Sequence, residues 1–413
     1  MELHERQLLE GLEAFLWRRE ARCLLTQPEE WQMLWQLAAE QHVLPMAADA
    51  LLPLYRRSGG ADALEAQVRR SVFAGAAEQA RRSRAFLQVY RRLMGQGTRP
   101  LVVKGILCRR LYPKPDLRSS ADEDLLVREE EFADIQKVLM AEGFRRLDEE
   151  SGDMQQVLSW YSGETGLCLE LHRSLFAGDS AAYGGLNRFF GGAFSHAVLE
   201  PLEDLEVWTL APEEHLLYLI LHSLKHFLHS GFGIRQVCDI CLFALSHGAQ
   251  IEWNSVFSRL EQAYADVFAA NLLEIGRKYL GFAEYPPELE SRLACCEGLL
   301  DCDDLLEDLL SGGVFGGNTE ERKHSSRITL NAAAAGAQSN SVQRLLRTAF
   351  PRRKELTRSY PYLQDCPWML PAAWVQRLMR YRAENRGCRA AARESISIGE
   401  RRVALMRKYR VIR

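Results

Sequence analysis

The sequence predicts an α+β protein in which a small mixed sheet is flanked by N- and C-terminal helical domains. Apolar residues recur at helical spacing up to residue 95, short β-rich runs replace them between 97 and 205, and helical spacing returns from residue 212. A chain of 413 residues is long enough for two or three packed units. The expected units are an N-terminal helical region at 1–96, the core at 97–205, a helical domain that closes a cleft at 206–311, a linker-like stretch at 312–342 and a basic helical region at 343–413.

Composition narrows the class of protein. Hydrophobic residues make up 47% of the chain and charged residues 26%, which is typical of a folded globular protein. The net charge of −3 excludes a protein whose whole surface binds nucleic acid. The N-terminus is charged, no run approaches the ~18 apolar residues that a membrane span needs, and the ten cysteines are scattered. These features favour a cytoplasmic protein without a membrane span.

The N-terminal region is predicted to be helical throughout. Apolar residues recur at helical spacing over 7–16 and 31–44, and residues 63–94 form one long predicted helix rich in Ala, Arg and Gln. Asp62 is predicted to be the N-cap of this helix, and the glycines that follow residue 94 are predicted to end it.

Short strands are predicted between residues 97 and 205. Two of them, 157–161 and 167–172, are joined across Gly163-Glu164-Thr165-Gly166, which is typical of a hairpin turn. The other predicted elements are a strand at 100–103, a short helix at 106–112, a strand at 122–127 and a helix at 129–142.

The C-terminal half is predicted to return to helices, with an uneven distribution of charge. Pro212 followed by two glutamates is typical of a helix N-terminus. Residues 299–310 carry an acidic cluster, whereas 11 Arg and 1 Lys against 3 Glu give residues 377–413 a charge of +9. Two interpretations of this basic segment remain: it binds the phosphates of a nucleic acid or polyanionic substrate, or it covers the chain's own acidic helices.

A pair of aspartates on the predicted strand 122–127 is the strongest signal of chemistry. Asp122 and Asp124 stand two residues apart, so a strand directs both side chains to the same face. Two carboxylates about 4 Å apart repel each other by about 4 kcal/mol at an effective dielectric constant of about 20. A divalent cation between them removes that repulsion, and Mg²⁺ prefers such oxygen ligands.

The strand at 167–172 adds a third carboxylate. Alternation places its three leucines on one face, and Glu170 and His172 on the other. Three carboxylates on two strands are what two-metal phosphoryl or nucleotidyl transfer requires. Upstream, Gly105 allows the backbone N–H groups of a helix N-terminus to approach a phosphate, and Lys104 adds a positive charge.

Together these motifs resemble the uncharacterised nucleotidyltransferase family of the DNA polymerase β-like superfamily. The resemblance covers most of the chain, and its specific motifs lie between residues 101 and 240. They are Lys104-Gly105, Leu111-Tyr112-Pro113, Arg118, Asp122-x-Asp124-Leu125-Leu126-Val127, Gly143-Phe144, Leu169-Glu170-Leu171-His172 and Arg235-x-x-x-Asp239.

The resemblance implies roles for the carboxylates and for the glycine turn. Asp122 and Asp124 would ligate Mg²⁺, or Mn²⁺ in its place. Glu170 would be a third metal ligand or would activate the acceptor hydroxyl. The Lys104-Gly105 turn would hold the nucleotide triphosphate.

Two positions depart from the superfamily pattern. Ile106 follows the glycine where a serine or glycine is usual, and Glu123 stands between the aspartates where an apolar residue is usual. Neighbouring residues would then complete the phosphate contacts. Ser119 or Ser120 would supply the missing hydroxyl, and Arg118 would neutralise phosphate charge.

Four histidines define one stripe on the helix predicted from Pro212. They are His215, His222, His226 and His229. Three interpretations remain: a wall of the active site that meets the nucleotide or acceptor, packing between helices, or metal binding. His222 and His226 are the candidates for the wall because the resemblance includes this helix.

Further candidates are His172, the pair of Arg235 and Asp239, and two cysteines. His172 is expected in the wall of the cleft. Arg235 and Asp239, four residues apart, either form a surface ion pair or line the cleft. Cys238-x-x-Cys241 is either half of a zinc knuckle or a pair of buried thiols.

The expected function is Mg²⁺-dependent transfer of a nucleoside monophosphate from an NTP to an acceptor hydroxyl or phosphate, with release of pyrophosphate. The acceptor could be a small molecule, a sugar, a peptide or RNA, and no obligate nucleic acid is expected. The alternative is a catalytically inactive nucleotide-binding or regulatory protein that binds a partner or RNA through its basic tail.

Overall fold

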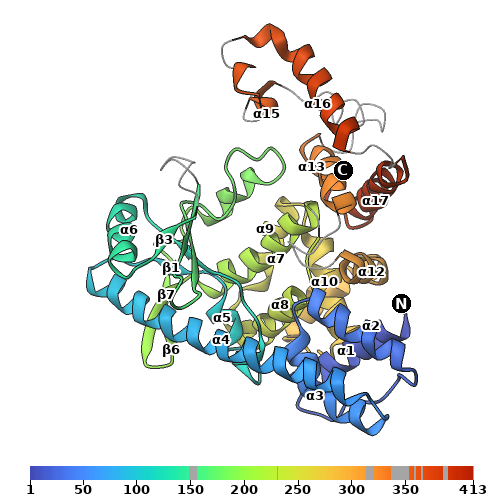
Figure 1. Ribbon diagram of the computed structural model, residues 1–413. Helices are drawn as coiled ribbons and strands as arrows, with labels where there is room; N and C mark the ends of the chain where they lie inside the picture. Colours follow the sequence, from blue (N-terminus) through green and yellow to red (C-terminus); the bar gives the residue numbers. More distant parts are fainter. Residues whose placement is uncertain are drawn as a thin grey trace.

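The protein has a seven-stranded mixed sheet, which lies to one side of a larger body of helices (Figure 1). The computed structural model describes residues 1–147, 156–229, 231–312, 320–335, 353–357, 360–363, 366–384 and 389–412. The predicted α+β class is confirmed.

The sheet combines parallel and antiparallel pairs. Its strands are β1 (Leu101–Val102), β2 (Glu123–Leu126), β3 (Arg145–Arg146), β4 (Val157–Tyr161), β5 (Cys168–His172), β6 (Val198–Leu202) and β7 (Leu205–Thr209), in the spatial order β3-β4-β5-β2-β1-β7-β6. β2 pairs with β5 and β1 with β7 in parallel, and the other neighbours are antiparallel.

Three of these strands were not found in the sequence. β3 has only two residues, too few to show alternation. β6 contains Pro201, and it exposes the apolar Leu199 while half-burying Glu200, so its residues do not alternate as a strand pattern requires. β7 extends the sheet to Thr209, beyond residue 205.

Four helices precede the sheet. They are α1 (Leu3–Leu16), α2 (Pro28–Glu40), α3 (Leu44–Arg57) and α4 (Asp62–Gly95). The expected N-cap of α4 was wrong, because Ala61 is the cap residue and Asp62 is the first helical residue. Its carboxylate still lies in the first turn, where the helix dipole favours a negative charge.

Helices α4 and α6 (Phe132–Ala141) cover one face of the sheet. Phe86 and Tyr90 of α4 and Ile135 of α6 are buried in one cluster with Leu125 of β2 and Leu171 of β5. The polar residues that alternate with these leucines therefore point to the opposite face of the sheet.

A helical bundle follows the sheet. It comprises α7 (Pro212–Leu228), α8 (Ile234–His247), α9 (Trp253–Gln262), α10 (Asp266–Tyr279), α11 (Pro287–Cys295) and α12 (Asp303–Gly312). Leu101 and Leu126, on the face of the sheet away from α4, share a buried cluster with Tyr218 of α7. This contact places α7 opposite the polar residues of β2 and β5.

The C-terminal helices are α13 (Glu320–Ala335), α15 (Arg353–Leu356), α16 (Leu370–Glu384) and α17 (Arg389–Lys408). Short 3-10 turns occupy 115–117, 129–131, 184–190, 248–250, 297–299, 361–363 and 367–369. α13 lies within the stretch expected to be linker-like, because it buries the small residues Ser325, Thr329 and Ala332 at helical spacing and also packs on α17. Residues 313–319 and 336–342 of that stretch lie outside the described residues.

The basic C-terminal helix covers acidic α12. Arg401 pairs with Glu307 at 2.9 Å, and Lys408 lies 2.7 Å from Asp301 and 2.5 Å from Asp304. Of the two interpretations of the basic segment, the described residues of α17 therefore support the cover over the chain's own acidic helix.

The structure also distinguishes the two interpretations of the cysteine pair on α8. Cys238 and Cys241 are free buried thiols on α8, and burial raises the pKa of both. They therefore follow the buried-thiol interpretation.

Within the part of the chain that the structure describes, no helix has both the length and the apolar character needed to cross a membrane.

Candidate functional site

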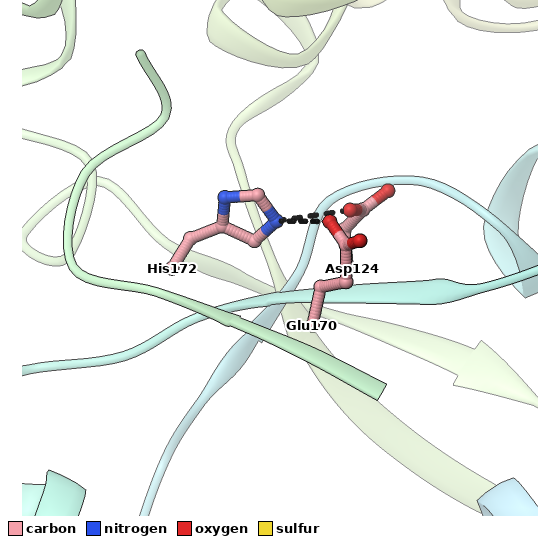
Figure 2. Close-up of side chains that lie close together, drawn as sticks. All are labelled: Asp124, Glu170 and His172. Carbon is pink, nitrogen blue, oxygen red and sulfur yellow. Dashed lines mark hydrogen bonds and ion pairs between the residues drawn. The ribbon is translucent and has the colours of Figure 1, made fainter. Parts of the chain in front are cut away.

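The candidate site is built on the parallel pair β2 and β5. Asp124 lies directly opposite Glu170 in the register of this pair, so both side chains leave the sheet on the same face. His172 follows Glu170 by two residues and points the same way. Figure 2 shows the imidazole of His172 directed at both carboxylates.

The three side chains are close enough to share one cation. His172 Nε2 lies 3.0 Å from Asp124 Oδ1 and 3.3 Å from Glu170 Oε2. One ligand atom from each residue lies within 4.8 Å of the others, and within the described residues this is the one group of its kind. The second oxygen of Asp124 is buried without a hydrogen-bond partner, and the nearest cation, Lys104 Nζ, is 3.9 Å away.

An unpartnered buried carboxylate oxygen carries a desolvation cost that a divalent cation would remove. Two carboxylates and an imidazole form a donor set that suits Mg²⁺ less well than Mn²⁺, because imidazole nitrogen is a softer ligand than oxygen. The residues present therefore fit a divalent metal.

The charges around the site stabilise each other. Burial by itself would raise the pKa of Asp124, but the charge of Lys104 and the hydrogen bond from His172 outweigh it and hold that pKa below its usual range. Burial would lower the pKa of His172, but its bonds to Asp124 and Glu170 raise the pKa to about 9. Without a metal, a protonated His172 thus balances part of the negative charge.

Asp122 lies beside the cluster, just before β2. Burial and the neighbouring charge of Asp124 raise its pKa above the usual range. Its carboxylate oxygens lie outside the group of close donor atoms. The structure therefore brings together two of the three carboxylates that the sequence singled out, with His172 as the third donor.

Glu123 points away from the site and closes the glycine turn. Its carboxylate accepts 2.6 Å from Ile106 N–H and 2.8 Å from Arg109, and all of these groups are buried. Gly105 has φ +59°, and a Cβ at this position would clash with the Glu123 carboxylate. Glu123 thus binds the Ile106 N–H group, which was expected to meet a phosphate. Lys104 is then the positively charged group that this turn contributes to the site.

Arg118, Ser119 and Ser120 fasten the segment that leads to Asp122. Arg118 is 1% exposed and donates two hydrogen bonds to Asp239, at 3.0 and 2.5 Å. Arg235 donates to the carbonyl of Ser119, and the hydroxyl of Ser120 donates to the carbonyl of Asp122 at 2.9 Å.

These contacts engage the groups that were expected to meet phosphate. The guanidinium of Arg118 is bound by Asp239, which also accepts a hydrogen bond from Tyr112 at 2.7 Å. Arg235 and Asp239 are buried and bind this segment, so the surface-pair interpretation was wrong. They hold α8 to the strand that carries the site.

The histidine stripe of α7 divides into a packing half and a half near the site. His215, in the first turn of α7, packs against Phe243 with ring centroids 4.7 Å apart and ring planes tilted by 50°. The rings of His222 and His226 meet edge to face at 4.5 Å. Burial first, and then the charges of Lys104 and Lys225, hold the pKa of both well below its usual range, so they are neutral.

Lys225 is a site residue that the sequence analysis missed. Burial and the charge of Lys104 lower its pKa, while Asp124, Glu170 and Asp122 oppose that shift, so Lys225 lies near enough to the carboxylates for their charges to act on it. Among the described residues, no hydrogen bond or ion pair within 4 Å holds it. The signal was available, because Lys225 is the single lysine of this helix and lies one turn after His222.

The comparisons with known proteins give one match. A family model described as uncharacterised nucleotidyltransferase matches residues 27–281, a range that contains β1 to β7 and α7 with every residue of the site. No curated protein and no solved structure gives a significant match.

Arg109→Met should destabilise the protein by about 3 kcal/mol, because it leaves the buried Glu123 carboxylate without its cation. The loss should be smaller at pH 4 than at pH 8, since a protonated Glu123 has no charge to leave unpaired. Urea unfolding at both pH values measures the free energy of unfolding. Arg110→Met, which removes the half-exposed neighbour, should cost about 1 kcal/mol or less.

The cluster should bind Mn²⁺ through nitrogen as well as oxygen. Asp124→Asn and His172→Gln should each weaken Mn²⁺ binding at least tenfold, which titration followed by electron paramagnetic resonance detects. Glu164→Gln, at an exposed turn, is the matched control and should leave the affinity unchanged. Equal affinities for all variants would exclude a metal at this cluster.

Proposed function

Because the chain belongs to the uncharacterised nucleotidyltransferase family, we propose that it transfers a nucleoside monophosphate from an NTP to an acceptor and releases pyrophosphate. The metal would be Mg²⁺ or Mn²⁺ at Asp124, Glu170 and His172. When bound, this cation supplies charge that stabilises the phosphate oxygens in the transition state.

One observation carries the proposal: two carboxylates on the sheet and two lysines, Lys104 and Lys225, come together at one site. Asp124 and Glu170 stand on the sheet, and Lys225 stands on α7 opposite them. Lys104 lies 3.9 Å from Asp124, and its charge helps to lower the pKa of Lys225, so both lysines act on the same site. A metal-bound triphosphate has the complementary charge pattern, with the metal toward the carboxylates and the terminal phosphates toward the lysines.

Each of these side chains would have a separate role in the reaction. An acceptor oxygen attacks the α-phosphorus, a new P–O bond forms, and the bond from the α-phosphorus to the bridging oxygen breaks. Lys104 and Lys225 would hold the β- and γ-phosphates that leave as pyrophosphate. Asp122, with its raised pKa and its place beside the donor cluster, would accept the proton from the acceptor.

Asp124→Asn should reduce turnover at least a hundredfold, because it removes the buried carboxylate that the metal needs. The assay supplies each α-labelled NTP with Mg²⁺ and a cell extract as the source of acceptor, and follows pyrophosphate and transferred label. Asp116→Asn, at an exposed position of the same segment, should keep full activity. NTP binding by the wild type without any transfer would instead support the inactive nucleotide-binding alternative.

Asp122→Asn should separate proton transfer from metal binding. The rate should fall at least a hundredfold at saturating NTP, while the affinity for Mn²⁺ changes less than threefold. Glu170→Gln provides the contrast, since it should weaken Mn²⁺ binding together with the rate. A parallel loss of Mn²⁺ binding in Asp122→Asn would instead make Asp122 a metal ligand.

A further inference from the structure

The last turn of α7 is capped by side chains from far along the chain. Arg402 of α17 donates to the carbonyl of His229 at 2.6 Å and to the carbonyl of Phe227. Thr329 of α13 donates to the carbonyl of Leu228 at 2.5 Å. Three successive carbonyls at this helix end are thus bound by residues outside the range that matches the family model.

Arg402 is completely buried at this position. Its side chain is 0% exposed, its guanidinium lies 5.5 Å from the centre of the Phe227 ring, and its Nε lies 3.5 Å from the carboxylate of Asp308 on α12. A buried guanidinium is costly unless its donors are bound. Here two backbone carbonyls and one carboxylate bind it, so three helices, α7, α12 and α17, meet at this one group.

The capped turn directly follows Lys225, the cation that α7 contributes to the site. Lys225 and His226 immediately precede the three bound carbonyls in the sequence. The free carbonyls of a helix C-terminus carry about half a negative charge. Left bare, they would repel a triphosphate that approaches Lys225, and the turn could fray. Arg402 cancels that charge and fixes the turn.

We propose that Arg402 is a positioning residue that holds Lys225 in place for the terminal phosphates of the nucleotide. The inference rests on the proposed function, because it concerns the phosphate side of the same site. Arg402 acts through α7 and does not itself touch the nucleotide. The C-terminal helices are accordingly part of the site's support, and their basic charge serves this purpose as well as the cover over α12.

The test compares Arg402→Met with Arg401→Met in the full-length protein. Arg401 is the adjacent arginine on α17, is half exposed and pairs with Glu307, so its variant removes the same charge without touching α7. The probe is inorganic triphosphate with Mg²⁺, measured by isothermal titration calorimetry, and Mn²⁺ binding to the sheet cluster is measured separately.

Arg402→Met should raise the Kd for triphosphate at least fivefold and change the Kd for Mn²⁺ less than twofold. If Arg402 served only the stability of the fold, its replacement would weaken the binding of triphosphate and of Mn²⁺ together, or of neither. Arg401→Met should change each Kd less than twofold. Equal triphosphate affinity in the two variants overturns the inference.

Two more variants keep the result interpretable. Arg402→Lys retains the charge but cannot bridge both carbonyls, so it should fold and raise the triphosphate Kd at least twofold. If this variant has the Kd of the wild type, the inference is overturned even if Arg402→Met fails to fold.

Lys225→Met should raise the triphosphate Kd at least tenfold, and Lys137→Met, at an exposed lysine, is its control. If Lys225→Met binds triphosphate normally, the phosphate side of the proposed function fails, and with it the premise for Arg402.

Discussion

The parallel pairing of β2 with β5 is the constraint on which the rest of the site depends. Its register sets Asp124 beside Glu170 and buries Leu125 and Leu171 on the other face. A slip by one residue would turn the leucines toward α7 and the carboxylates into the apolar layer under α4. The packing of α4 and α6 therefore fixes the place of the carboxylates, although neither helix takes part in the site.

Two buried ion pairs then connect this strand pair to the surrounding helices. Arg109 and the N–H of Ile106 bind Glu123, which ties β2 to the glycine turn that carries Lys104. Arg118 binds Asp239, which ties the approach to β2 to α8. Both pairs are costly to bury, and both gain from further hydrogen bonds that satisfy the carboxylate. Their common effect is to fix the turn that carries Lys104 to β2 and to fix the segment that leads to Asp122 to α8.

Much of the fold could be predicted because its signals are local. Alternation on 167–172, the proline and glutamates at 212–214 and the long run of helix formers at 63–94 each lie within one element. Such patterns report which face of an element is buried, whatever its neighbours are. The strand pair β6–β7 was missed because a proline and an exposed leucine interrupt the local pattern of β6, although the pairing of β7 with β1 stabilises the hairpin.

By itself the sequence determined the family and the face on which Asp124, Glu170 and His172 lie, because strand periodicity and motif spacing are properties of the chain alone. Only the tertiary structure decided which side chains contact one another. The sequence does not say that Glu123 would bind the turn expected to bind phosphate, that Asp239 would bind Arg118, or that Lys225 would face the carboxylates. Each of these contacts joins residues from different elements, and the distances and burial that choose between an ion pair and a ligand site arise only when the sheet and the helices pack together.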